Sequence, residues 1–440
     1  MIQTVENIGE KLVSMLTYDA SQPLIFSSGL FLFLFAGFLF FYGFTRRAPI
    51  ARIVYVILFS LYFYYKSSGI YFLLLVFASV SDYWIAHAIY KVRTQRAKYW
   101  LVGLSVLVNL GMLGYFKYTN FLIEIANNLF GQGFLNFQNI FLPVGISFFV
   151  FQSMSYTIDI CRGQLKPLNN WADYLFYLSF FPQLVAGPIV RAKDFIPQIR
   201  QNPLRVTREM FGMGVFLILI GLFKKAVISD YISLNFVDRI FDEPLLYSGF
   251  ECLMGIYGYA LQIYCDFSGY SDMAIGIALL LGFRFPKNFD APYKSATITE
   301  FWRRWHISLS TWLRDYLYIS LGGNRKGRIR TYFNLLVTML LGGLWHGAAV
   351  RFILWGALHG IALALHKLWL SVVPGSKATG AEMRWFWRIP GIFFTFNLVC
   401  FGWLMFRAES MKTVQLMLHQ IFTNFNPSVI PQAVSYTHLR

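Results

Sequence analysis

The chain has 440 residues, of which 57% are hydrophobic and only 13% are charged, whereas ordinary soluble domains are roughly 45–50% apolar and about 25% charged. This composition excludes a water-soluble fold and predicts an integral membrane protein surrounded by lipid. The formal net charge is +17, but the basic residues stand in short blocks between apolar segments, which is typical of cytoplasmic loops and not of a nucleic-acid-binding surface.

The apolar segments recur along nearly the whole chain, which predicts one membrane domain at residues 24–408. A cleaved signal peptide begins with a basic stretch followed by an apolar one, and residues 1–23 do not show this pattern. The first span is therefore expected to be a permanent anchor. Residues 409–440 are expected to be a C-terminal tail without a closing span, either truncated or divergent. The four cysteines are far apart in the chain and are expected to be packing residues.

A helix needs about 20 mostly apolar residues to cross a bilayer. The second candidate span is short for this purpose, and the others meet or approach the length. The expected fold is therefore an all-α polytopic membrane protein. The candidate spans are residues 24–44, 53–65, 70–90, 100–116, 140–160, 211–231, 252–283, 332–350, 352–370 and 390–406.

The basic loops set the expected orientation. Those after the first and third spans fall on the same side, which the positive-inside rule assigns to the cytoplasm. Residues 171–189 are apolar but contain Pro182, Gly187 and Pro188. If they crossed the membrane, the basic loop after them would lie outside, so we expect a re-entrant segment whose broken backbone is shielded by protein or by a water-filled cavity. The most basic loop, residues 284–330, then lies inside.

Residues 297–325, TITEFWRRWHISLSTWLRDYLYISLGGNR, are too charged to span a membrane. Placed at about 100° per residue, the apolar side chains form one stripe and the polar ones cover the other face. The pattern predicts an amphipathic helix at the cytoplasmic interface, where tryptophan is enriched. The stripe consists of Trp302, Trp305, Leu309, Trp312, Leu313 and Tyr316, and the polar face of Arg303, Arg304, Ser308, Thr311, Arg314 and Asp315.

His306 lies at the edge of this stripe, next to Ser310, where its ring would face a crevice. An ordinary interfacial histidine is the alternative interpretation. Basic side chains on a helix face suit phosphate groups, so Arg303, Arg304 and Arg314 could bind either lipid headgroups or the phosphates of an acyl donor.

Residues 332–350 contain no charged residue and place His346 near their outer end, beside Trp345. An ionisable group inside a membrane segment indicates function by default, although a neutral imidazole could also be structural. The neighbouring glycines could allow close helix packing or leave room for a substrate. His359 in the next apolar run could face the same cavity. The histidines and cysteines show no metal-binding pattern.

Residues 252–283 carry Asp266 and Asp272 in the stretch DFSGYSDMAIG. Two carboxylates inside one apolar segment must face protein or water. They could orient a histidine, bind a basic group across the core, or have a purely structural role.

Several stretches together make the sequence similar to the membrane-bound O-acyltransferase family, over about residues 26–409, and within it to the branch that acetylates exported polysaccharides such as alginate. The resemblance implies a ring of about 10–12 transmembrane and re-entrant helices around a central tunnel. It also implies functional histidines at the positions of His306 and His346. The stretches are LPVGISFFVFQSMSYTIDICRG, FPQLVAGPIVR, YCDFSGYSDMAIGIALLLGFRFPKNF, TEFWRRWHISLSTWLRDYLYISLGGNR and TMLLGGLWHGA.

The resemblance leads us to expect His346 to act as a general base, because imidazole titrates near neutral pH, and His306 to position the donor or stabilise the oxyanion. Further residues are expected to bind the donor or line the tunnel. These are Arg303, Arg304, Trp305, Ser310, Arg314, Asp315, Trp345, Asp266 and Asp272.

The expected reaction passes acetyl from cytoplasmic acetyl-CoA, a substrate and not a bound cofactor, to hydroxyls of an exported alginate-like polysaccharide. A periplasmic or extracellular partner protein is expected to complete the transfer, in a bacterial inner membrane. D-alanyl or other acyl transfer from a carrier protein to a cell-wall polymer, and peptidoglycan O-acetylation, remain alternatives. A transporter would be expected to show related half-sequences, and none is visible.

Overall fold

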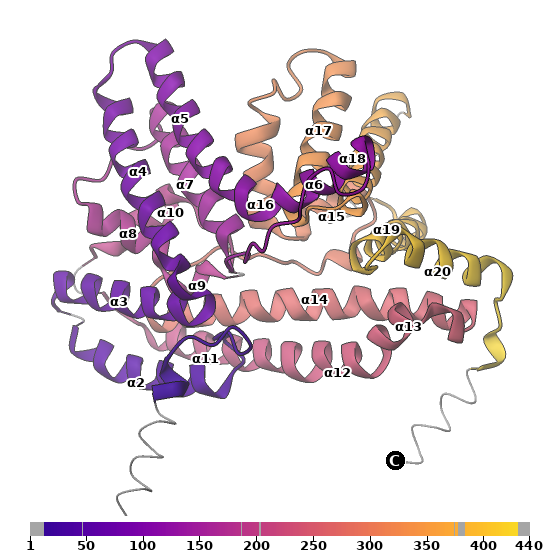
Figure 1. Ribbon diagram of the computed structural model, residues 1–440, viewed down its shortest axis with the longest axis horizontal. Helices are drawn as coiled ribbons and strands as arrows, with labels where there is room; N and C mark the ends of the chain where they lie inside the picture. Colours follow the sequence, from indigo (N-terminus) through magenta and orange to yellow (C-terminus); the bar gives the residue numbers. More distant parts are fainter. Residues whose placement is uncertain are drawn as a thin grey trace, which may run out of the picture. The chain divides into compact units, whose positions relative to one another are not determined.

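The computed structural model describes residues 13–45, 47–185, 187–201, 204–373, 375–376 and 383–429. Within these residues the secondary structure is helical throughout, with no strand (Figure 1). The expected all-α fold is therefore confirmed. Expectations that concern residues 1–12 and 430–440 fall outside the described residues.

The chain folds into two compact units and passes between them at three points: within α11, within α14, and in the loop after Lys287. The first unit is built from Met1–Ile220 and Tyr270–Lys287. Its helices are α2 (Gly29–Thr45), α3 (Pro49–Ser68), α4 (Phe72–Lys91), α5 (Gln95–Leu113), α6 (Thr119–Phe130), α7 (Ile146–Cys161), α8 (Trp171–Ser179), α9 (Phe181–Leu184), α10 (Ala192–Ile199), most of α11 (Arg208–Leu222) and the end of α14 (Gly249–Leu280).

The second unit comprises Gly221–Gly269 and Asn288–Arg440. Its helices are α12 (Asp230–Ile232), α13 (Asp238–Asp242), the first part of α14, α15 (Ile298–Arg304), α16 (Ile307–Trp312), α17 (Arg328–His346), α18 (Val350–Val372), α19 (Trp385–Arg407) and α20 (Met411–Thr423). Short π-helical segments connect several of these helices, including η3 (Phe223–Ser229), η4 (Ser233–Val237) and η7 (Leu313–Tyr318).

Five of the described helical segments are long and apolar enough to cross a membrane. Three of them join two or more helices through short 3₁₀ or π-helical stretches, so each of these helical runs is longer than the span expected from hydropathy. The polytopic membrane architecture is thus supported, whereas the central tunnel stays a prediction. The segments are Pro49–Lys91, Gln95–Phe130, Arg208–Asp242, Val350–Val372 and Trp385–Arg407.

The span expected at residues 53–65 is too short, because α3 has 20 residues and begins at Pro49. Proline suits the first helical turn, where its missing N–H would have no partner anyway. Arg52, in this first turn, is fully buried. Its guanidinium donates to the carbonyl oxygens of Ile199 and Gln201 at 2.9 and 2.8 Å. These hydrogen bonds allow a charged residue to stand, buried, in the first turn of the helix.

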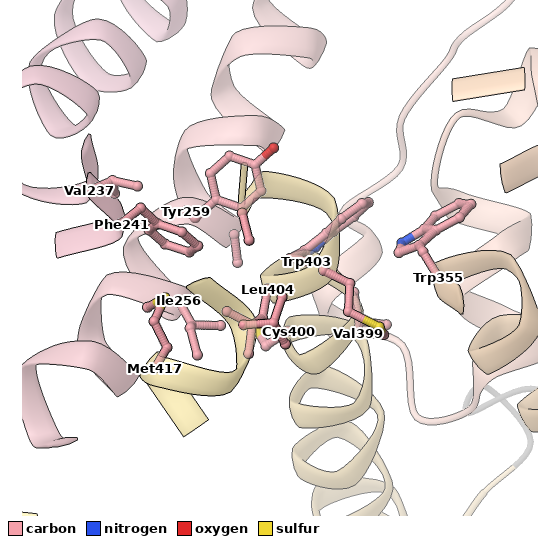
Figure 2. Close-up of a cluster of buried hydrophobic side chains, with 14 of the residues drawn as sticks. Val237, Phe241, Ile256, Tyr259, Trp355, Val399, Cys400, Trp403, Leu404 and Met417 are labelled. Atoms are coloured by element: carbon pink, nitrogen blue, oxygen red, sulfur yellow. The ribbon is translucent and has the colours of Figure 1, made fainter. Parts of the chain in front are cut away.

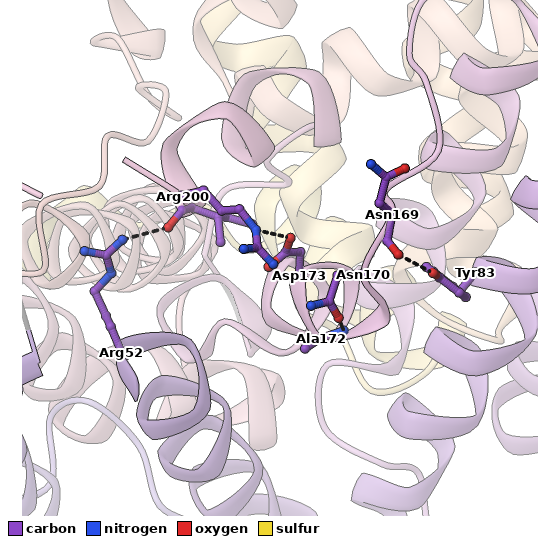
Figure 3. A network of polar contacts seen from close by, with 8 residues as sticks. Arg52, Tyr83, Asn169, Asn170, Ala172, Asp173 and Arg200 are labelled. Atoms are coloured by element: carbon purple, nitrogen blue, oxygen red, sulfur yellow. Dashed lines mark hydrogen bonds and ion pairs between the residues drawn. The ribbon is translucent and has the colours of Figure 1, made fainter. Parts of the chain in front are cut away.

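The same region of the first unit holds the broken apolar segment (Figure 3). The side chain of Asn170 caps α8 by accepting from the Ala172 N–H at 2.9 Å, and the buried Asp173 pairs with Arg200 at 2.6 Å. The helix stops at Ser179, and Pro182 stands in the short α9 that follows. The predicted break and its shielding by protein are confirmed, since the side chains of α9 are all buried; whether the segment returns to the same side stays a prediction.

The core of the second unit is a cluster of buried side chains contributed by α13, α14, α18, α19 and α20, together with η4 (Figure 2). The Trp355 and Trp403 rings stack with centroids 6.1 Å apart, and Trp355 also contacts Trp302 of α15. Burying large aromatic side chains is the main source of packing energy here. The cluster packs side chains of α18 and α19 together.

Candidate active site

The site begins with a capping box that starts α15. The Thr297 side chain accepts from the Glu300 N–H at 3.1 Å, and the Glu300 carboxylate accepts from the Ala296 N–H at 3.0 Å. This reciprocal pairing satisfies backbone donors at a helix start. Arg304 at the other end of α15 pairs with Glu300 at 2.9 Å, so the first helix of the motif is held at both ends by its own side chains.

The motif does not form one helix, and this prediction is wrong. α15 ends at Arg304, Trp305 is extended, and His306 takes a left-handed conformation with φ 41° before α16 begins. The break is stabilised by Asn288, whose carbonyl accepts from the Ile307 N–H at 2.9 Å. Left-handed backbone is uncommon for residues other than glycine and marks strain that often serves function.

Most of the apolar stripe is buried in protein. Trp305, Leu309 and Trp312 are all less than 10% exposed. His306 contacts Trp345 with ring centroids 6.2 Å apart, and Trp345 is next to the last residue of α17, a helix of 19 residues or about 28 Å. His306 therefore lies near the C-terminal end of α17, and the predicted location at the cytoplasmic interface stays a prediction.

His306 itself caps α16. Its Nδ1 accepts a hydrogen bond from the Leu309 backbone N–H at 3.4 Å. Because Nδ1 is the acceptor, the neutral ring carries its proton on Nε2. That Nε2 is buried and has no hydrogen-bond partner among the described residues. Burial lowers the pKa of His306 to about 3, so the ring is a neutral donor at physiological pH.

His346 is the last residue of α17 and is only partly buried. Its ring is surrounded by three aromatic rings, with centroid distances of 4.9 Å to Trp345, 5.1 Å to Trp355 and 5.1 Å to Phe406. These rings come from three different helices, α17, α18 and α19. Trp345 contacts both His346 and His306, so the structure brings the two predicted histidines into contact with one indole ring.

The glycines beside His346 serve helix packing. A Cβ on Gly343 would come within 2.2 Å of the Phe352 carbonyl oxygen, and one on Gly347 within 1.9 Å of the Phe352 ring. A Cβ on Gly342 would meet nothing closer than 3.2 Å, at the flexible Leu313 side chain. Close approach of α17 to α18 therefore requires glycine at two of the three positions, and the packing interpretation is favoured over room for substrate.

Most other predicted site residues are engaged in local contacts. Ser310 donates to the Trp305 carbonyl at 3.1 Å and so stabilises the break. Arg314 pairs with its neighbour Asp315 at 2.7 Å. Arg303 is exposed, which leaves it the best placed of the predicted arginines for binding a phosphate.

The two carboxylates of α14 have different surroundings. Asp266 pairs with Lys225 at 2.7 Å, and Lys225 also pairs with Asp230 at 2.8 Å. Asp266 thus binds a basic group, one of the roles expected for it. Asp272 belongs to the first unit.

Sequence reasoning missed the rings that surround the histidines. Trp355 and Phe406 contact His346, and Phe267 contacts His306 with centroids 4.6 Å apart. Trp355 could have been found, because it precedes His359 by four residues and so shares its face of α18. Phe406 and Phe267 carry no such local signal.

Comparison with known proteins identifies the family. Residues 164–411 match the model of the membrane-bound O-acyltransferase family. A protein of Azotobacter vinelandii named "probable alginate O-acetylase" is 44% identical over 91% of this chain and 78% of its own length. A peptidoglycan O-acetyltransferase of Helicobacter pylori is 37% identical over 90% and 79%, and a teichoic acid D-alanyltransferase of Streptococcus thermophilus is 31% identical over 72% and 77%. The chain belongs to the membrane-bound O-acyltransferase family and is an O-acyltransferase.

Proposed function

We propose that this protein passes an acetyl group from acetyl-CoA to the hydroxyls of an exported, alginate-like polysaccharide. The observation that carries the proposal is the position of His346, a partly exposed imidazole in an aromatic surround at the end of a membrane helix. The high identity to relatives named as alginate O-acetylases supports acetyl as the acyl group and a polysaccharide as the final acceptor.

The reaction needs one base and no net proton release. His346 takes the proton from the acceptor hydroxyl as its oxygen attacks the thioester carbonyl carbon. The tetrahedral intermediate then collapses, the carbon–sulfur bond breaks, and the proton on His346 passes to the departing thiolate. General acid–base catalysis of this kind contributes typically about 10²–10⁴-fold to the rate.

His306 supplies a donor for the developing oxyanion. Its capping bond to Leu309 leaves the proton on Nε2, which is buried and has no partner among the described residues. A neutral N–H in a dry site is a preorganised hydrogen-bond donor of the type that stabilises oxyanions. The neighbouring Trp345 sets the spacing between this donor and His346.

The donor enters from the cytoplasm and the acceptor from the opposite side of a bacterial inner membrane, with the basic loops cytoplasmic. A periplasmic or extracellular partner protein completes transfer to the polysaccharide. Arg303, which is exposed at the end of α15, binds the phosphates of the donor. No cofactor is needed for this chemistry beyond the acetyl-CoA substrate.

The test uses the purified protein in proteoliposomes with acetyl-labelled acetyl-CoA, a de-acetylated uronic-acid polysaccharide and the partner protein. The intact chain should release free CoA thiol and label the polymer, and His346→Ala should do neither. His419→Ala is the matched control, because it removes an exposed imidazole from α20 and should keep full transfer. Transfer by a folded His346→Ala protein would contradict the assigned role.

The relatives that act on peptidoglycan and teichoic acid define the alternative. The same vesicles would be given a D-alanyl thioester on a carrier protein, or peptidoglycan in place of the uronic-acid polymer. If the carrier thioester turns over faster than acetyl-CoA, the transferred group is D-alanyl and not acetyl. If only peptidoglycan is labelled, the acceptor is peptidoglycan and the proposed acyl-transfer chemistry is unchanged.

A further inference from the structure

A cavity of about 1070 Å³ lies in the second unit, where α18 and α19 meet the start of α15. Ligand pockets in proteins typically have volumes of about 300–1,000 Å³, so this cavity can hold a sizeable ligand. The helices approach closely on one side of it, because a Cβ on Gly391 of α19 would lie 2.7 Å from the Ala296 carbonyl oxygen. Neither His306 nor His346 lines the cavity, so it is separate from the candidate active site.

Most of the cavity wall is apolar. Leu365 and Trp369 of α18 and Phe394 of α19 line it, and these residues are 59%, 59% and 70% exposed. The cavity is therefore open at the surface of the two helices. Both helices are long and apolar enough to cross a membrane, so this surface faces lipid hydrocarbon. A ligand that enters here must be apolar over most of its length, because unpaired polar groups are costly in hydrocarbon.

One end of the cavity carries positive charge. Arg384, directly before α19, is the one charged residue of the described lining, and its guanidinium lies over the Phe386 ring, 4.8 Å from the centroid. Arg388 stands in the first turn of the helix. Neither arginine forms an ion pair with a described residue. Because no acidic side chain stands in the described lining, this end of the cavity is complementary to an anion.

The charged end lies beside the basic loop at residues 284–330. Lys367, near the end of α18, donates to the Asn324 side chain of that loop at 2.7 Å. Trp369 and Trp387 line the cavity from the adjacent ends of α18 and α19, and both are exposed. Exposed tryptophans are typical of the membrane–water interface, and basic pockets between transmembrane helices on the cytoplasmic side bind anionic lipid headgroups. With the basic loops cytoplasmic, as proposed above, this end faces the cytoplasmic leaflet.

The number of charged groups favours a lipid over the acyl donor as the ligand of this cavity. The CoA moiety carries several phosphate groups and a polar adenine ring, and Arg384 is the one charged side chain of the described lining that could bind them. A phospholipid such as phosphatidylglycerol has one phosphodiester joined to long acyl chains. One arginine at the end of an open apolar cavity matches that chemistry.

We propose that the cavity binds an anionic phospholipid, with an acyl chain between α18 and α19 and its phosphate on Arg384. The bound lipid also packs against Ala296 and Thr297, which line the cavity and form part of the capping box that starts α15. Because α15 ends directly before the break at Trp305 and His306, the lipid supports the helix that leads to the site. The binding does not depend on which acyl group is transferred.

Two variants test the two parts of the ligand. Arg384→Gln removes the charge at the end of the cavity, and Leu365→Trp fills the apolar part from an exposed position of α18. Arg330→Gln is the matched control for charge, since Arg330 is also exposed and lies over a ring, that of Phe333 at 5.3 Å, but does not line this cavity. Leu368→Trp is the control for size, on an exposed residue of α18 outside the lining.

The measurement is thermal unfolding of delipidated protein in a neutral detergent, titrated separately with phosphatidylglycerol, phosphatidylcholine, glycerol phosphate and acetyl-CoA. A ligand that binds the folded protein raises its unfolding temperature. Phosphatidylglycerol should act on the intact chain at a lower concentration than phosphatidylcholine. Arg384→Gln should weaken the phosphatidylglycerol effect about fivefold, Leu365→Trp should remove it, and both controls should behave as the intact chain does.

Native mass spectrometry of the same proteins measures the bound lipid directly. A retained phosphatidylglycerol is expected on the intact chain and on both controls. Retention should fall in Arg384→Gln, which changes an exposed side chain and tests the proposal even if Leu365→Trp does not fold. Equal effects of phosphatidylglycerol and phosphatidylcholine would indicate ordinary solvation by lipid and overturn the proposal.

Two further results would also overturn it. One is a phosphatidylglycerol effect that is unchanged in folded Arg384→Gln and Leu365→Trp proteins, because the lipid would then bind elsewhere. The other is an unfolding shift with acetyl-CoA or glycerol phosphate that is lost in Arg384→Gln and is not matched by phosphatidylglycerol, because the ligand would then be a soluble phosphate compound. None of these measurements uses acyl transfer, so a failure of the proposed function leaves their outcome unaffected.

Discussion

The Leu309 backbone N–H donates to the Nδ1 atom of His306, and this 3.4 Å hydrogen bond gives one imidazole two tasks. Nδ1 starts α16, and Nε2, which then carries the proton, faces the buried site. The helix cap therefore selects the tautomer that an oxyanion donor needs. The two tasks can be separated by mutation, because they use different ring nitrogens.

Replacing His306 by asparagine should separate the two tasks. Asparagine is a good N-cap and tolerates left-handed backbone, so His306→Asn should fold with nearly unchanged stability but lose transfer activity. His306→Ala should lose activity and also about 0.5–2 kcal/mol of stability through the missing cap. Thermal unfolding and CoA release, measured on both variants, check this. Equal stability of the two variants would show that the cap contributes little.

The stability of the protein should fall in acid partly because of His306. Its pKa is about 3 in the folded protein against an ordinary value of 6.5, so the unfolded chain binds the proton more readily. The stabilisation is complete above about pH 6.5 and is lost progressively as the pH falls toward 3. Unfolding temperatures at pH 7 and pH 4.5 should therefore differ less for His306→Asn than for the intact protein. An equal difference would mean that His306 is already protonated in the fold.

Adjacent glycines of α17 should respond differently to the same substitution. Gly343→Ala drives a Cβ to 2.2 Å from the Phe352 carbonyl oxygen, which forces α17 away from α18 and should cost about 1–3 kcal/mol. It should also lower transfer, because His346 is three residues further along the same helix. Gly342→Ala meets only the Leu313 side chain at 3.2 Å and should change little. Unfolding temperature and CoA release on the pair provide the comparison.

Asp82 should be essential for the stability of the first unit. It is fully buried on α4 and accepts from Ser105 at 2.7 Å, from Asn109 at 2.6 Å and from Ser153, which joins α4 to α5 and α7. Asp82→Ala should cost about 1–3 kcal/mol for each donor left unpaired. The exposed Asp242 is the control, since its replacement by alanine should stay within about 0.5 kcal/mol. Detergent-solubilised yield and unfolding temperature measure the difference.

The sequence by itself determined the class of the protein and its helical architecture, and it predicted His306 and His346 as the two leading site residues. Hydropathy placed α14, α17, α18 and α19 within a few residues of their observed ends, because burial in a membrane imposes long uninterrupted apolar runs. The motif around His306 and His346 was long enough to indicate the family. These are local properties, because each depends on a continuous stretch of the chain.

Only the tertiary structure decided what surrounds the histidines. The periodicity of residues 297–325 predicted one helix, yet the chain turns at His306, because Asn288, from the preceding loop, accepts hydrogen bonds from the Ile307 and Ser308 backbone N–H groups. The His346 surround combines Trp355 of α18 with Phe406 of α19, and the Gly402 backbone on α19 lies close to His359 of α18. Contacts between residues far apart in the chain depend on how helices pack, so they cannot be predicted from local composition or periodicity.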